Sequence, residues 1–270
     1  MIDPRLSDSI LARIEAALAA PHRAPLVVGI CGAQGSGKST LVAHLAARLE
    51  AEGIGVAALS LDDLYLTRAE RLRLAETVHP LFATRGVPGT HDVALGLDLL
   101  AALERGEAAP LPRFDKAADD RAPQDSWPLA PAATQVLLFE GWCLGARPQS
   151  DVGQPVNALE AGEDPDGVWR RHANAALAGD YHRLFARIDL LVLLAAPGWE
   201  VVARWREQQE AELRASGGPA VMSLAEVLRF IQHYERLTRW ILEEMPARAD
   251  LTVRLGEGRE VLALDPVSLR

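Results

Sequence analysis

The sequence contains few cysteines, few aromatic residues and no long hydrophobic run. Only Cys31 and Cys143 occur among its 270 residues, which excludes a disulfide scaffold and indicates a reducing compartment. The longest apolar runs, such as LLVLLAA at 190–196, are far too short to cross a bilayer. The opening residues, MIDPRLSDSI, lack a basic stretch followed by an apolar run and so predict no signal peptide. We therefore expect a cytoplasmic protein that does not bind membranes.

Positive charge is also scarce, with 28 Lys and Arg against 37 Asp and Glu and a net charge of −9. This balance disfavours nucleic acid as the main partner, although a locally positive pocket can still bind a small anion. A chain of this length with 49 % hydrophobic residues builds a core without a disulfide or a metal. We expect a single domain over 1–270, with an N-terminal helix within 1–24 and a lid within 200–220. The sequence leaves the oligomeric state open.

The hydrophobic pattern predicts strands alternating with helices. Leu6, Ile10, Ile14 and Leu18 recur every four residues and indicate an amphipathic N-terminal helix. Continuous apolar runs predict strands at 25–32, 56–66, 134–142 and 188–197, with short strands at 249–255 and 259–264. Helical patterns lie between them at 38–53, 93–106, 199–213 and 223–246. This alternation is typical of an α/β protein with a mainly parallel sheet between two layers of helices.

A glycine-rich motif follows the first predicted strand. Residues 32–39 read GAQGSGKS, which matches the P-loop pattern G-x-x-x-x-G-K-[ST] between a strand and a helix. Glycines let the backbone N–H groups turn toward phosphate oxygens, and the helix N-terminus adds its positive dipole end. The guanine-reading pattern N-K-x-D is absent, so ATP is the expected nucleotide. The expected ATP contacts are Gly32, Ala33, Gln34, Gly35, Ser36, Gly37, Lys38, Ser39 and Thr40, with Lys38 on the β- and γ-phosphates and Ser39 on Mg²⁺.

Carboxylates follow two of the predicted strands, at the sheet edge where ligands bind in such folds. Asp62 and Asp63 end the second strand, and Glu140 ends the third. Phosphoryl transfer to a hydroxyl needs a group that takes the hydroxyl proton and oxygen ligands for Mg²⁺. Either aspartate suits the first task. Glu140 suits the second, with Mg²⁺ expected between Ser39 and the strand-end acids.

Two polar, turn-rich stretches and one charged helix supply candidate contacts for the phosphoryl acceptor. Arg85, Lys116 and Arg121 can pair with an anionic acceptor. Asp92 precedes a helix, so it is either the cap of that helix or a substrate contact. On the helix after the fourth strand, Arg204 and Arg206 either stabilise transition-state charge as part of a lid or form a solvated face.

Several stretches together resemble the D-glycerate 3-kinase family, which belongs to the P-loop kinase group with uridine kinase, phosphoribulokinase and pantothenate kinase. They are SLDDLYLT, HPLFATRGVPGTHD, LPRFDKAADDR, LLFEGWCLG, WRRHANAAL and ARWREQQE, in that order. The resemblance extends from about Val27 to near Met245. It implies a P-loop kinase fold and phosphorylation of D-glycerate at its 3-hydroxyl by ATP and Mg²⁺.

The resemblance also implies roles for individual residues. Asp62 matches the general base, and this match alone separates it from Asp63. The implied acceptor contacts are Tyr65, Asp92, Phe114 and Asp115. Glu140 matches the acid near Mg²⁺. Arg204 and Arg206 match the basic residues of the lid. Our reading of the small carboxylate substrate adds Arg85 for its carboxylate, His91 and Asp92 for its hydroxyls, and Lys116 as a further cation. The alternatives are a kinase of the same fold acting on a nucleoside, pantothenate or a sugar phosphate, and a switch ATPase that works through partner binding.

Overall fold

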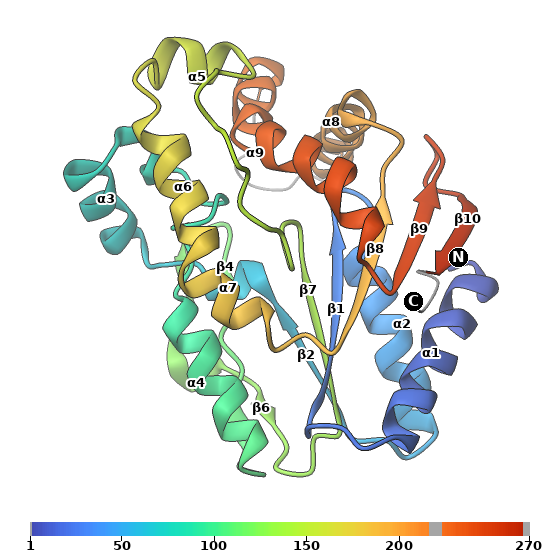
Figure 1. Cartoon of the computed structure of the whole chain (residues 1–270). Coiled ribbons are helices and arrows are strands. Elements are labelled where there is room, and N and C mark those ends of the chain that lie inside the picture. Colours follow the sequence, from blue (N-terminus) through green and yellow to red (C-terminus); the bar gives the residue numbers. More distant parts are fainter. Residues whose placement is uncertain (1, 216–222, 267–270) are drawn as a thin grey trace.

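A computed structural model describes residues 2–215 and 223–266, and a six-stranded sheet runs through its centre (Figure 1). The strand order is β10-β9-β8-β1-β7-β2, and each neighbouring pair is parallel except β9 and β10, which are antiparallel. The strands are β1 (Leu26–Gly32), β2 (Val56–Ser60), β7 (Val136–Gly141), β8 (Leu190–Ala195), β9 (Leu251–Leu255) and β10 (Val261–Pro266). Because β7 lies between β1 and β2, the carboxyl ends of these three strands meet at one edge.

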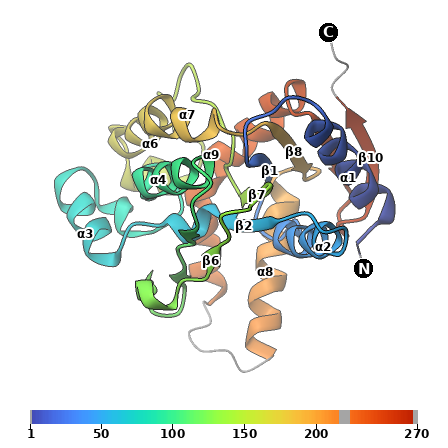
Figure 2. The same cartoon turned by 90° about the horizontal axis from the view of Figure 1, so that it is seen from below.

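Helices cover both faces of the sheet, as the view along it shows (Figure 2). Every residue of β1 and β7 is buried, which explains their unbroken apolar sequences. One face carries α1 (Pro4–Ala19) and α2 (Lys38–Ala51), and the other carries α4 (Val93–Glu104), α7 (Asp180–Phe185) and α9 (Leu224–Glu244). The expected three-layer α/β fold with a mainly parallel sheet is confirmed.

The region between β2 and β7 contains short elements that the hydrophobic pattern does not indicate. They are α3 (Arg68–Thr77), the 3₁₀ helices η1 (Leu61–Leu64), η2 (Pro80–Ala83) and η3 (Gln124–Ser126), and the antiparallel pairs β3 (Ala109–Pro110) with β6 (Leu129–Ala130) and β4 (Phe114–Asp115) with β5 (Asp120–Arg121). In α3 the one buried residue is Arg71, so this helix has no apolar stripe. A capping box between Thr67 and Glu70 begins it instead. The second expected strand ends earlier than its apolar run, at Ser60, and both aspartates lie on η1.

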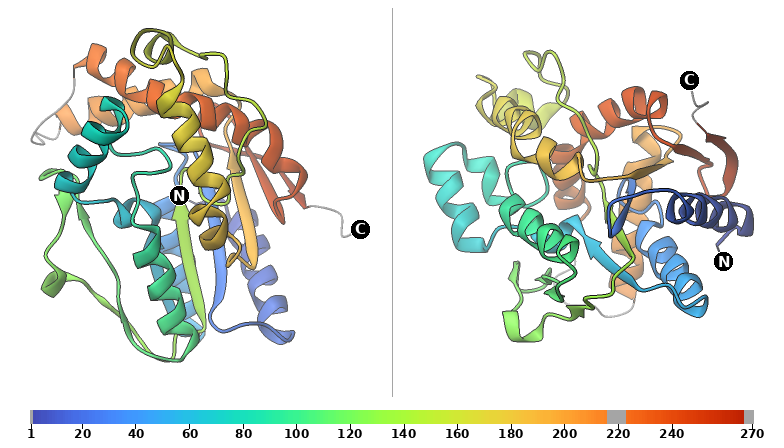
Figure 3. Two further views of the ribbon diagram at one scale, coloured as in Figure 1. Left: turned by 60° about the vertical axis from the view of Figure 1, so that its left-hand side comes forward. Right: turned by 60° about the horizontal axis from the view of Figure 1, so that its bottom comes forward.

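The remaining described helices are α5 (Ala158–Glu163), α6 (Val168–Ala178), α8 (Trp199–Ala215), which follows the carboxyl end of β8, and the 3₁₀ helix η4 (Met245–Ala247), which connects α9 to the amino end of β9. The expected lid helix is α8, which lies alongside α9 (Figure 3). Residues 216–220 of the expected lid fall outside the described residues. Within 2–215 and 223–266, none of the helices combines the length and apolarity that a membrane crossing needs.

Candidate active site

The P-loop curls between β1 and α2, and its glycines are required by the backbone. Gly35 and Gly37 have φ of 77° and 90°, which favours glycine. A Cβ on Gly32 would lie 2.7 Å from the Ser36 hydroxyl oxygen, so a side chain cannot be accommodated there without a shift. Gly37 is the N-cap of α2 and brings no side chain to accept from the first N–H groups of that helix. These donors remain free for an anion, so the cradle fits phosphate.

The reactive side chains of the cradle face the strand ends. The Lys38 ammonium donates to the Ala33 carbonyl oxygen at 3.1 Å. The Ser39 hydroxyl donates to Glu140 Oε1 at 2.9 Å. A hydroxyl and a carboxylate are oxygen ligands that suit Mg²⁺, which usually takes one or two carboxylates with substrate phosphates rather than a complete protein cage. Consistent with that, no cluster of three or more His, Cys, Asp or Glu side chains able to hold a metal occurs in the part of the chain that the structure describes.

A cavity of about 660 Å³ opens beside the P-loop. It lies between Gly37 and Thr40 of the cradle, the N-terminus of α1, and the turn between β9 and β10. No sequence motif predicts this cavity, because its walls come from both ends of the chain. The same holds for Arg259, whose Nε donates to the Gly35 carbonyl oxygen at 2.6 Å and whose guanidinium lies 5.1 Å from the Trp205 ring centroid.

The two aspartates of η1 have separate partners. Asp62 accepts a hydrogen bond from the Tyr65 hydroxyl at 2.9 Å and pairs with the Lys116 ammonium at 2.7 Å. Asp63 accepts from the Phe114 backbone N–H at 3.0 Å and pairs with Arg113 at 3.3 Å. Asp63 therefore fixes the β4–β5 hairpin to η1, while Asp62 faces the polar side chains of the acceptor loops.

These surroundings shift the two carboxyl pKa values in opposite directions. Burial raises the pKa of Asp62, but the adjacent Lys116 ammonium and the Tyr65 hydrogen bond outweigh it, and its pKa lies below the ordinary value. Burial raises the pKa of Asp63, and the hydrogen bond from the Phe114 N–H offsets this only in part. Asp62 is therefore held ionised, as a proton acceptor must be.

The loop before α4 lies against η1 through a backbone bridge between Tyr65 and His91. The His91 ring stacks on the Tyr65 ring with centroids 4.5 Å apart, and Phe114 meets the edge of Tyr65 at 5.2 Å. Burial lowers the pKa of His91 to about 3, so its imidazole is neutral at physiological pH. Tyr65, His91 and Phe114 thus form one aromatic wall beside Asp62.

The other expected acceptor contacts are engaged within the protein. Arg85 pairs with Asp119 and lies 5.4 Å from the Phe114 ring centroid. Asp92 caps α4 through the Leu95 N–H and pairs with Arg121 at 3.1 Å, so the capping role left open by the sequence is present. The Asp115 carboxylate caps its own hairpin turn, where it accepts from the N–H groups of residues 117 and 118.

The two arginines of α8 point in different directions, since residues two apart on a helix lie on different faces. Arg204 is exposed and pairs with Glu257 at 2.8 Å. Arg206 lies 5.7 Å from the Phe230 ring centroid on α9. A neighbour of Phe230 on that helix, Tyr234, donates to the Arg85 carbonyl oxygen at 3.1 Å. Arg206 is thus the arginine on the acceptor side of α8.

Comparison with known proteins identifies relatives along most of the chain. No protein-family model matches it. An uncharacterized kinase of Schizosaccharomyces pombe, mug58, is 38 % identical over 226 residues, which cover 79 % of this chain and 80 % of that protein. The chloroplastic D-glycerate 3-kinase of Arabidopsis thaliana is 34 % identical over 221 residues, 78 % of this chain but 46 % of the plant protein. The solved structure of D-glycerate 3-kinase from Cryptococcus neoformans var. grubii superposes with a TM-score of 0.78 at 26 % identity, covering 97 % of this chain and 98 % of that one.

The chain belongs to the same kinase family as mug58, and it is similar to D-glycerate 3-kinases over most of its length. It is therefore a kinase with a P-loop nucleotide-binding fold. Kinases of this kind use ATP and a divalent metal in general. The chain spans less than half of the plant D-glycerate 3-kinase, although it spans nearly all of the fungal one.

Proposed function

We propose that this kinase phosphorylates D-glycerate at its 3-hydroxyl with Mg-ATP, as its similarity to D-glycerate 3-kinases suggests, and that Asp62 is the general base. The observation that carries the proposal is the arrangement at the ends of β2 and β7. Ser60 and Glu140 are partners in the register of these strands. Glu140 holds the P-loop serine, and Asp62, on η1 directly after Ser60, holds Tyr65 and Lys116. The carboxylates proposed as proton acceptor and metal ligand therefore come from the ends of two neighbouring strands, next to the phosphate cradle.

The nucleotide would bind along the P-loop. Lys38 and the first N–H groups of α2 would hold the phosphates, and the cavity beside the cradle would receive the adenosine end, for which its volume is suitable. Ser39 and Glu140, with Asp62 near by, would hold Mg²⁺, which supplies positive charge to the transferring phosphoryl group. Arg206, on the acceptor side of α8, is better oriented than Arg204 to add a further positive charge.

The acceptor would bind against the aromatic wall. Asp62 would accept the proton of the attacking hydroxyl, having been kept ionised by Lys116. Arg85 and Lys116 would face the glycerate carboxylate, which must compete with their present partners, Asp119 and Asp62. His91 would contact a hydroxyl. Asp92, whose two oxygens already hold Leu95 and Arg121, would act by keeping Arg121 in place.

The test is ADP release from Mg-ATP, measured with D-glycerate, L-glycerate, uridine, pantothenate and ribulose 5-phosphate as acceptors. We expect release that depends on D-glycerate and a product that phosphorus NMR identifies as 3-phosphoglycerate. Lys38→Ala should abolish the signal, which controls for contaminating ATPases. Release with another acceptor in place of D-glycerate would overturn the substrate assignment, and release that no acceptor stimulates would favour a switch ATPase.

A further inference from the structure

A buried tyrosine on a distant element contacts the histidine of the acceptor wall. Tyr181 belongs to α7 and is 90 residues away from His91 in sequence. Its hydroxyl lies 2.5 Å from His91 Nδ1, 3.2 Å from the His91 backbone nitrogen and 2.9 Å from the Gly89 backbone nitrogen. Both residues are almost fully buried, with 2 % and 5 % of their surfaces exposed. Water therefore does not compete for these contacts.

The three contacts are compatible with one placement of the hydrogen atoms on the Tyr181 hydroxyl and the His91 ring. The backbone N–H groups of Gly89 and His91 are donors, so the Tyr181 oxygen accepts twice. Burial raises the pKa of Tyr181 well above its usual value, and the hydroxyl keeps its proton. Among the residues that the structure describes, that proton has one remaining hydrogen-bond partner, His91 Nδ1, which must accept it. The hydrogen of the neutral imidazole then lies on Nε2.

The Nε2 atom of His91 is buried and has no hydrogen-bond partner within residues 2–215 and 223–266. An unpaired buried donor is costly, and one beside a reactive carboxylate calls for a functional reason. We propose that Tyr181 is a positioning residue that fixes His91 as its Nε2–H tautomer, and that this N–H donates to an oxygen of the bound acceptor. The second half of the proposal rests on the proposed kinase function, whereas the first half does not.

The chain contains a buried histidine of the opposite kind, which serves as an internal reference. His233 on α9 has its Nδ1 3.1 Å from the Phe230 carbonyl oxygen. A carbonyl only accepts, so Nδ1 of His233 carries the hydrogen. The two buried imidazoles should therefore be opposite tautomers in the same spectrum.

The first experiment is ¹⁵N NMR of protein labelled at histidine, with His91 assigned from its loss in His91→Gln. We expect an Nε2–H pattern for His91 and an Nδ1–H pattern for His233. Tyr181→Phe removes the hydroxyl but keeps the ring, and should alter the His91 nitrogens while His233 stays unchanged. A His91 already in the Nδ1–H form, or one indifferent to Tyr181→Phe, would overturn the tautomer assignment whether or not glycerate is the substrate.

The second experiment tests donation to the acceptor. D-Glycerate, or whichever acceptor drives ADP release, should shift the His91 Nε2 and its proton. In His91→Gln the side-chain amide reaches the place of Nε2, whereas in His91→Asn it reaches only that of Nδ1. We expect the acceptor KM to rise about tenfold in His91→Asn and Tyr181→Phe, with much smaller changes in kcat and in His91→Gln. Equal losses in His91→Gln and His91→Asn, or an unshifted Nε2 at saturating acceptor, would contradict donation.

Discussion

Asp62 and Asp63 are neighbours in the chain, but their carboxylates perform different tasks in the structure. Asp62 lies beside Tyr65 and Lys116, whereas Asp63 holds the Phe114 N–H. We predict that Asp62→Asn lowers kcat by about 10²- to 10⁴-fold, the usual contribution of a general base. Asp63→Asn keeps an oxygen for the Phe114 N–H and should retain kcat within about tenfold. Steady-state ADP release measures both variants, and losses of equal size would contradict the assignment.

For individual residues, the sequence predicts the kind of chemistry that each side chain can perform but not the groups that it contacts. The P-loop residues could be predicted from the spacing of the motif, because contiguous residues form the phosphate-binding loop. The different roles of Asp62 and Asp63 could not be predicted, since the group that Asp63 binds, the Phe114 N–H, is 51 residues away in the sequence. For the same reason the sequence gives no sign that Asp119 pairs with Arg85, or that Tyr181 pairs with His91, because neither pair belongs to one motif.

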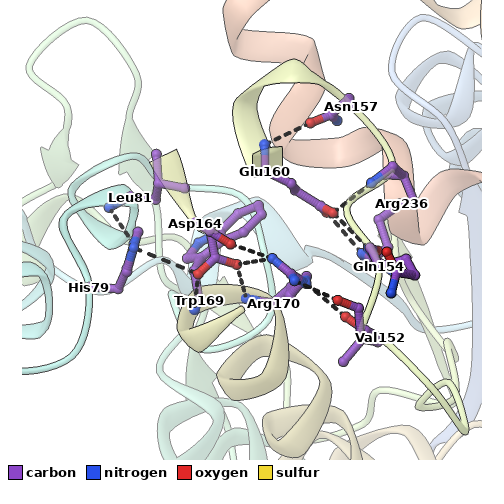
Figure 4. A network of polar contacts seen from close by, with 12 residues as sticks. His79, Leu81, Val152, Gln154, Asn157, Glu160, Asp164, Trp169, Arg170 and Arg236 are labelled. Atoms are coloured by element: carbon purple, nitrogen blue, oxygen red, sulfur yellow. Dashed lines mark hydrogen bonds and ion pairs between the residues drawn. The ribbon is translucent and has the colours of Figure 1, made fainter. Parts of the chain in front are cut away.

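The elements around the acceptor side are joined by a buried polar network (Figure 4). Asp164, which ends α5, and Arg170 of α6 form an ion pair at 3.0 Å with side chains 1 % and 2 % exposed. Arg170 also donates to the Val152 and Gly153 carbonyl oxygens at 2.7 Å, which fixes the chain before α5 to α6. Sequence patterns missed both helices. A specific buried ion pair therefore contributes to the placement of these helices, in addition to apolar contacts.

We predict that Arg170→Met lowers the free energy of unfolding by about 3–5 kcal/mol, because it leaves the buried Asp164 carboxylate without its arginine partner. The matched control is Arg229→Met, which removes the exposed pair with Glu163 at 2.7 Å and should cost at most about 1 kcal/mol. Urea unfolding measures both. Adding Asp164→Asn to Arg170→Met should recover part of the loss, and a loss as small as that of the control would show that the pair is unimportant.

Across the whole molecule, the sequence predicts the core better than the periphery. Strands buried on both faces must be apolar throughout, so the sheet could be traced from hydrophobic runs. The outer elements α3, α5 and the two-residue strands carry too few apolar residues to leave a pattern. The cavity beside the P-loop depends on α1 and the β9–β10 turn meeting, which is a property of the assembled fold.

The two buried histidines make the stability of the whole molecule sensitive to acid. Burial lowers the pKa of His91 to about 3 and that of His233 to about 4, whereas an unfolded histidine titrates near pH 6.5. As the pH falls from about 6.5 toward 4, the unfolded chain therefore takes up protons that the folded chain does not. The stabilisation that the two neutral histidines contribute is fully present above pH 6.5. Between pH 7 and pH 5, each of them lowers the free energy of unfolding by about 2 kcal/mol.

Two buried histidines contribute to the fall in the free energy of unfolding between pH 7 and pH 5. We predict that replacing His233, which lies outside the proposed site, halves their joint contribution. His233→Asn keeps a donor for the Phe230 carbonyl oxygen and no longer titrates. The free energy of unfolding, measured by urea at pH 7 and pH 5, should then fall by about 2 kcal/mol less than in the unsubstituted protein. His22→Gln, at an exposed position, serves as the control. An unchanged difference between the two pH values in His233→Asn would mean that acid acts on the fold through other groups.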